Sequence, residues 1–113
     1  MIISFNDIGQ VCASFAYLGE LQPGDACSIV AAGTVARAGD GEAFIGKVIS
    51  IRDNIACVAV KGFVSLPYGN VSIKTGYTKL SGDGTGCVVP DEDGRTYLVT
   101  GLDVLQHTVT VLL

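Results

Sequence analysis

Few residues of this sequence have the chemistry of a catalytic group, and none stands in a catalytic motif. His107 is the only histidine, and it precedes a Thr-Val-Thr-Val segment that is typical of a strand, which we expect to be an edge strand. A histidine base needs a nucleophile and an orienting acid close to it in space. The serines that could be this nucleophile lack a Gly-x-Ser-x-Gly turn; they are Ser14, Ser28, Ser50, Ser65 and Ser72. We therefore expect a structural role for His107, no catalytic residue and no enzyme activity.

Two short segments have the composition of ligand-binding loops but lack the residues that such loops need. A phosphate loop leads into a helix and carries a Lys-Ser/Thr pair, whereas Gly82–Gly86 is followed by Cys87-Val88-Val89-Pro90, which is typical of a strand. We interpret Gly82–Gly86 as a hairpin turn. Asp91-Glu92-Asp93-Gly94 lacks the ligand spacing and the closing Glu of a calcium loop. We interpret it as a solvated hairpin tip, and a cation site at a subunit contact stays open as the alternative.

The cysteines have neither the spacing of a metal site nor the context of a disulfide framework. Cys12, Cys27, Cys57 and Cys87 are 15, 30 and 30 residues apart, and zinc ligands occur in closer pairs. The N-terminal Met-Ile-Ile-Ser-Phe-Asn-Asp lacks the features of a secretory signal. We therefore expect four reduced, buried thiols in a reducing cytosol, with no metal and no cofactor.

The composition limits the classes of protein to which this chain can belong. The chain has 113 residues, enough for one domain, of which 49% are hydrophobic and 16% charged, and its net charge is −4. The seven Lys and Arg residues form no basic cluster, so we expect no binding to nucleic acid. No apolar run reaches the length of a membrane span, and we expect no membrane partner. The positive mean hydropathy favours apolar surface that is covered by partner subunits.

The distribution of turns and apolar segments predicts an all-β fold. Turn dipeptides, among them Asp53-Asn54 and Asp83-Gly84, separate segments rich in Val, Ile and Thr. We predict strands at 26–31, 34–38, 43–52, 55–66, 85–89, 95–101 and 107–113. Several short strands at this spacing indicate a small β-barrel or sandwich of antiparallel strands with hairpin turns.

The segment 7–18 allows two interpretations. Its apolar residues recur at helical spacing and a glycine follows, but alternate residues would also share one face of a strand. Gly9 disfavours a helix, so the strand is favoured and the helix stays open. We divide the chain into 1–20, an N-terminal arm or short helix, and 21–113, a single β-barrel domain.

Several segments occur in an order that is known from one protein family. They are Pro23-Gly24-Asp25-Ala26, Gly39-Asp40-Gly41-Glu42, Phe44-Ile45-Gly46-Lys47-Val48, Val58-Ala59-Val60-Lys61-Gly62-Phe63-Val64, Gly76-Tyr77-Thr78-Lys79-Leu80 with Asp83-Gly84, and Val109-Thr110-Val111-Leu112-Leu113. Over residues 20–113 the chain resembles the small β-rich head-decoration (capsid cement) proteins of tailed bacteriophages and prophages.

This resemblance implies a structural protein that binds and stabilises the major-capsid lattice. It implies a homotrimer, with itself and the major capsid protein as partners. The protein would occupy the host-cell cytoplasm before assembly and the virion head, on the capsid surface, afterwards. The family has no active site to carry over. The residues that we predict at an oligomer or capsid contact are Phe15, Tyr17, Val111, Leu112 and Leu113.

A small β-barrel module that binds a ligand or a peptide is the alternative function. Such a module needs a pocket lined by apolar and aromatic side chains. The aromatic candidates in this sequence are Tyr17, Phe44, Phe63 and Tyr68.

Overall fold

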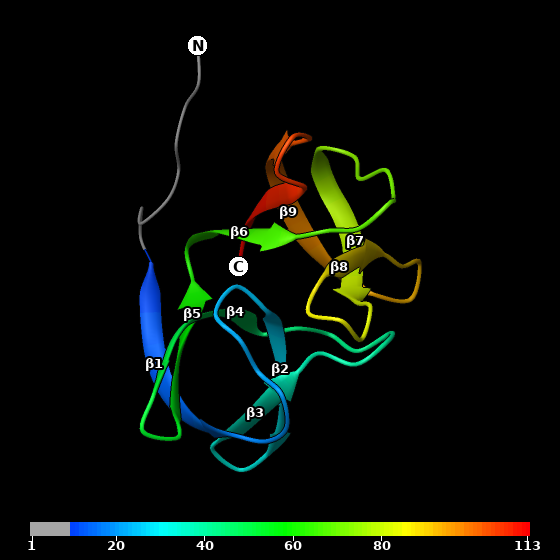
Figure 1. Ribbon diagram of the computed structural model, residues 1–113. Coiled ribbons are helices and arrows are strands. Elements are labelled where there is room, and N and C mark those ends of the chain that lie inside the picture. Colours follow the sequence, from blue (N-terminus) through cyan, green and yellow to red (C-terminus); the bar gives the residue numbers. More distant parts are fainter. Residues whose placement is uncertain (1–9) are drawn as a thin grey trace.

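The computed structural model describes residues 10–113, and this part of the chain is all-β (Figure 1). The first half is a closed barrel in the order β1-β3-β2-β4-β5. Its strands are β1 (Val11–Tyr17), β2 (Ala26–Ala31), β3 (Thr34–Arg37), β4 (Gly46–Arg52) and β5 (Ile55–Lys61). The second half is a five-stranded sheet in the order β6-β10-β9-β7-β8. Its strands are β6 (Phe63–Pro67), β7 (Gly76–Gly82), β8 (Val88–Pro90), β9 (Arg95–Asp103) and β10 (Thr108–Leu112). The predicted fold class is confirmed.

The structure corrects two strand predictions. The segment 55–66 is not one strand but two, because Gly62 adopts φ 95° between β5 and β6 and turns the chain from the barrel into the second sheet. Strand β7 was not predicted at all. Its sequence, Gly-Tyr-Thr-Lys-Leu-Ser-Gly, begins and ends in glycine and has little intrinsic strand preference. Pairing with β8 on one side and β9 on the other holds it extended.

Two predicted hairpin turns are present, and a third segment is different. Asp53 and Asn54 adopt φ 52° and 66° in the turn between β4 and β5, the left-handed pair that a two-residue hairpin requires. Gly82–Gly86 joins the antiparallel strands β7 and β8. The 91–94 segment is not a hairpin tip, because β8 and β9 do not pair with each other. They lie on opposite sides of β7, where Pro90 and Arg95 both face Leu80.

Strand β1 decides between the two interpretations of segment 7–18, for the residues that the structure describes. It pairs antiparallel with β5 along its length and parallel with β3 at Ala16 and Tyr17. The helix is therefore wrong for residues 11–17. Alternation explains the outcome, since Ala13, Phe15 and Tyr17 are half-buried while the residues between them are exposed. We predicted that residues 1–20 form an arm or short helix before the domain. Within this range, β1 is instead one of the strands of the closed barrel. Residues 1–9 lie outside the part of the chain that the structure describes.

The core consists of two clusters, one in each half. The buried residues of the barrel cluster are Leu21, Cys27, Val35, Val48, Ala56 and Val58. The second cluster is larger and lies mainly in the second sheet, with Leu66, Leu80, Val99, Val109 and Val111 fully or almost fully buried. It also takes side chains from the barrel half. The largest of these is Phe44, in the loop between β3 and β4.

Phe44 joins the two halves through its ring and its carbonyl group. The ring stacks on that of Tyr97 in β9, with centroids 4.3 Å apart and an interplanar angle of 6°. The Tyr97 hydroxyl donates a buried hydrogen bond of 2.6 Å to the Phe44 carbonyl oxygen. Burial raises the pKa of Tyr97, which keeps the hydroxyl protonated as a donor. One residue of a barrel loop is thereby fixed in the centre of the second core.

Backbone hydrogen bonds continue this junction along the end of β7. Gly82 accepts from the Gly41 N–H at 3.0 Å and donates to the Glu42 carbonyl at 2.8 Å. A Cβ at Gly82 would lie 2.6 Å from the Cβ of Ala38, so only glycine allows the two halves to approach this closely.

We predict that the Phe44–Tyr97 contact contributes strongly to stability. Tyr97→Phe should lower the free energy of unfolding by about 1–3 kcal/mol, because it leaves the Phe44 carbonyl buried without its donor. Phe44→Ala should cost about 3–5 kcal/mol, because it leaves a cavity. Urea unfolding measures both. The control is Tyr77→Phe, which removes a hydroxyl from a side chain that is 80% exposed. Equal effects at Tyr77 and Tyr97 would contradict the prediction.

Candidate interaction surface

The structure separates the residues that we predicted at an oligomer or capsid contact. Phe15 and Tyr17 are half-buried on β1 and pack against the barrel cluster. Val111 is fully buried in the second core, and half-buried Leu113 packs against it. Only Leu112 exposes a substantial fraction, 37%. The second core therefore covers Val111 and contacts Leu113, whereas Leu112 lies on the opposite face of β10.

We expected His107 to lie on an edge strand. It lies instead in the turn before β10, where its φ is 54°. Its ring centroid is 5.3 Å from that of Tyr68, and its carbonyl accepts the Tyr68 N–H at 2.9 Å. These contacts anchor the turn to the end of β6.

An open cleft of about 460 Å³ lies at this end of the second sheet. Its lining residues are Tyr68, Gly69, Asn70, Val71, Ser72, Val104 and His107. Of the four aromatic residues that we proposed for a pocket, only Tyr68 lines it. Phe44 is fully buried, Tyr17 packs inside the barrel and Phe63 lies on β6.

Two apolar side chains project from the turn between β9 and β10, which we call the hairpin tip (residues 103–107). Val104 is 69% exposed and Leu105 is 92% exposed. The Asp103 carboxylate holds the backbone beneath them by accepting the N–H groups of Leu105 and Gln106, both at 3.1 Å. The tip is therefore a firmly held turn with unusually exposed apolar groups. Our sequence reasoning missed it, although a Val-Leu pair between two predicted strands was the available signal.

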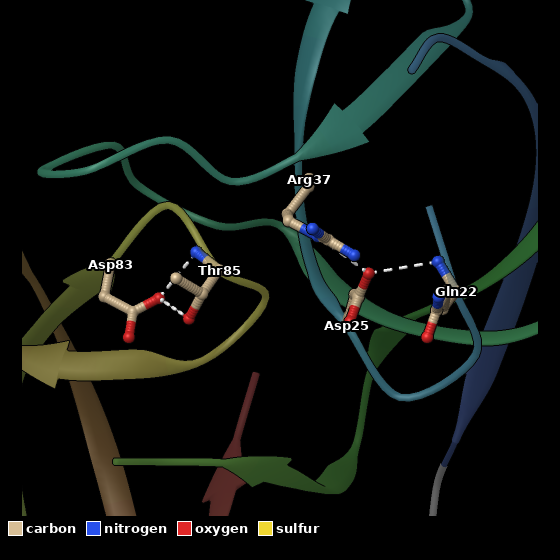
Figure 2. Close-up of polar contacts among 5 residues, drawn as sticks. All are labelled: Gln22, Asp25, Arg37, Asp83 and Thr85. Atoms are coloured by element: carbon tan, nitrogen blue, oxygen red, sulfur yellow. Dashed lines mark hydrogen bonds and ion pairs between the residues drawn. The ribbon is translucent and has the colours of Figure 1, made fainter. Parts of the chain in front are cut away.

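The acidic groups near the barrel junction are used in local structure (Figure 2). Asp25 pairs with the Arg37 Nε at 3.0 Å and also accepts the Gln22 N–H at 3.0 Å. Asp83 accepts both the N–H and the hydroxyl of Thr85, at 2.8 and 2.7 Å. These bonds fix the turn that precedes β2 and the turn between β7 and β8, in agreement with the structural interpretation of Gly82–Gly86.

The Asp91 carboxylate organises the link that crosses β7. It accepts the Asp93 N–H at 2.9 Å and the hydroxyl of buried Ser81 at 2.8 Å. These two bonds, the backbone one first, lower the pKa of Asp91. Among residues 10–113, no group of three or more His, Cys, Asp or Glu side chains is placed to hold a metal ion.

The four thiols have different environments. Cys27 is buried, and its thiol lies 3.7 Å from the Gly46 carbonyl oxygen. Burial, with Asp25 as a smaller cause, raises the pKa of Cys27 to about 12. Cys57 and Cys87 are half-buried, and Cys12 is exposed on β1. The expectation that all four are buried is therefore wrong for Cys12, because its side chain alternates with the inward-facing ones of β1.

Comparisons with protein-family models, with curated proteins and with solved structures find no match to this chain. The described residues also contain no helix of the length and apolar character that crossing a membrane requires.

We predict that the cysteines are reduced and react in the order of their exposure. Titration with a thiol reagent in denaturant, without reductant, should count four thiols per chain. In the native protein Cys12 should react first. Cys27 should react only on unfolding, because its thiolate is disfavoured. Cys27→Ala should remove the slowest phase, and Cys12→Ser the fastest. A count of two or fewer would contradict the reduced state.

We also predict that Asp91 makes stability depend on pH. Its pKa is lowered in the folded state, so its contribution is present above its unfolded-state pKa of about 4 and is lost as the pH falls through the folded value. Wild type should therefore lose more stability than Asp91→Asn between about pH 5 and pH 2, as measured by urea unfolding. Glu92→Gln, which removes an exposed carboxylate of the same link, is the control. Identical pH profiles for wild type and Asp91→Asn would oppose this assignment.

Proposed function

We propose that this protein is a structural, non-enzymatic subunit that decorates the head of a bacteriophage or prophage and stabilises the major-capsid lattice. The family resemblance supports the proposal, and its segments lie at positions that matter for the fold. Pro23–Ala26 leads into β2, and Phe44–Val48 links the junction to β4. Val58–Val64 connects the barrel to the second sheet, and Val109–Leu113 contains β10.

The observation that carries the proposal is the hairpin tip. A turn that is held by Asp103 and presents Val104 and Leu105 to solvent is suited to insertion into an apolar site on another protein. Because the backbone is already fixed, little conformational entropy is lost when it binds. A capsid offers many identical sites, and a homo-oligomer would engage several of them at once, so that modest contacts of its linked tips add up.

The cleft beside the tip favours the second candidate, a module that binds a ligand or a peptide. Tyr68, Val71 and Val104 offer apolar contacts there, and His107 and Asn70 offer polar ones. The cleft is open rather than enclosed, whereas small-molecule sites bury most of their ligand. The geometry therefore favours a macromolecular partner.

The test is binding to empty heads that are assembled from the major capsid protein of the same genome. The wild-type protein should sediment with the heads and saturate at a fixed number of copies per shell. Leu105→Glu should weaken binding by about 30-fold, because a charge at the centre of an apolar contact costs about 2 kcal/mol or more.

Leu18→Glu is the matched control, since Leu18 is an apolar side chain of the barrel that is 59% exposed. It should bind heads as the wild type does, and both variants should keep the wild-type unfolding midpoint. No binding by the wild type would refute the capsid role. If Leu105→Glu bound heads as strongly as Leu18→Glu and the wild type, the tip would not be the contact.

A further inference from the structure

The turn between β7 and β8 contains one of the three Asp-Gly dipeptides of this chain, which lie at 40–41, 83–84 and 93–94. Because glycine has no Cβ, its nitrogen can approach the carboxyl carbon of a preceding aspartate more closely than the nitrogen of another residue can. A succinimide ring forms when the nitrogen bonds to that carbon. The dipeptides are identical in sequence, and their surroundings in the fold distinguish them.

The nitrogens of the three glycines differ in their hydrogen bonds. The Gly41 N–H donates to the Gly82 carbonyl at 3.0 Å, and the Gly94 N–H donates to the Asp91 carbonyl at 2.9 Å. In the described part of the chain the N–H of Gly84 has no acceptor, and this glycine is exposed. A nitrogen that must first give up a hydrogen bond reacts more slowly, so the Gly84 nitrogen is the most available of the three.

The Asp83 carboxyl group is held and polarised by Thr85. Its Oδ1 accepts the Thr85 N–H at 2.8 Å and the Thr85 hydroxyl at 2.7 Å (Figure 2). A carboxylate that accepts the N–H two residues further on folds over the peptide between them, which brings Cγ of Asp83 towards the Gly84 nitrogen. The same two donors stabilise negative charge that develops on Oδ1 when Cγ becomes tetrahedral. Within residues 10–113, the carboxylates of Asp40 and Asp93 have no such donors.

We propose that Asp83 is a self-modification site, at which Gly84 and Thr85 promote the isomerisation of the aspartate to isoaspartate with water as co-reactant. The Gly84 nitrogen attacks Cγ of Asp83 and a Cγ–N bond forms. The Oδ2 oxygen leaves as water, with the proton of the Gly84 N–H and one proton from solvent. Water then adds to one of the two carbonyl carbons of the succinimide and breaks its bond to nitrogen. Attack at Cγ restores aspartate, and attack at the main-chain carbon gives isoaspartate.

The modification lengthens the main chain by a methylene group beside the junction of the two halves. On one side of the turn, Gly82 bonds to the backbone of Gly41 and Glu42. On the other side, the Gly86 carbonyl accepts the Ala26 N–H at 2.9 Å. A methylene inserted between these anchors changes their spacing. The site is independent of the proposed capsid role, because the turn makes no part of the hairpin tip.

Incubation of the folded protein in heavy-oxygen water at neutral pH tests the site. Each passage through the succinimide inserts a solvent oxygen into the residue, and mass spectrometry of peptides from a digest locates the label. Asp83 should acquire label and isoaspartate at least about tenfold faster than Asp40 or Asp93. In concentrated urea, where the contacts of the fold are lost, the three sites should react at similar rates.

Two variants at one position separate the chemistry from the sequence. Thr85→Val removes the hydroxyl donor and should slow the labelling of Asp83 about fivefold or more. Thr85→Ser keeps the hydroxyl and should react as the wild type does. Both should leave the rates at Asp40 and Asp93 unchanged and retain the far-ultraviolet circular dichroism of the wild type.

Three results would each overturn the proposal. The first is equal labelling of the three aspartates in the folded protein. The second is a lead of Asp83 that persists in urea, since the cause would then not be the fold. The third is an unchanged rate at Asp83 in Thr85→Val.

Discussion

The insertion of Phe44 into the second sheet is the interaction on which the rest of the structure depends. The barrel and the second sheet each close their own backbone hydrogen bonds, but the barrel cluster contains only small and medium-sized buried side chains. Phe44 and Tyr97 are the two largest fully buried side chains, and they stack on each other across the junction. The Tyr97 hydroxyl satisfies the carbonyl of the residue that it contacts. A single pair of aromatic residues thus makes two small halves fold around one larger core.

This junction leaves the hairpin tip on the second sheet, where it extends beyond the last pairs of β9 and β10. The Asp103 carboxylate positions the tip through the N–H groups of Leu105 and Gln106. The barrel completes the core through Ala26, Ala38, Phe44 and Ala59.

Acidic side chains of the described residues stabilise turns and links of the fold. Each buried side-chain nitrogen or oxygen in this part of the chain has a hydrogen-bond partner. The bonds of Asp25, Asp83, Asp91 and Asp103 all stabilise turns or links. The exposed apolar residues are the groups whose contacts the chain itself does not complete, which is why the proposed functions use them.

The sequence by itself determined the all-β class, most strands and the Asp53-Asn54 hairpin, because alternation and turn chemistry are local properties. Tertiary structure decided what depends on partners distant in sequence. Strand β7 exists through its two neighbours, and β1 is a strand because β5 and β3 pair with it. The apolar C-terminus predicted a contact surface, but the sheet buries Val111 and exposes Leu112. That Tyr77, Leu98 and Leu112 face one another on three strands could not be predicted, since it arises only when these strands align in one register.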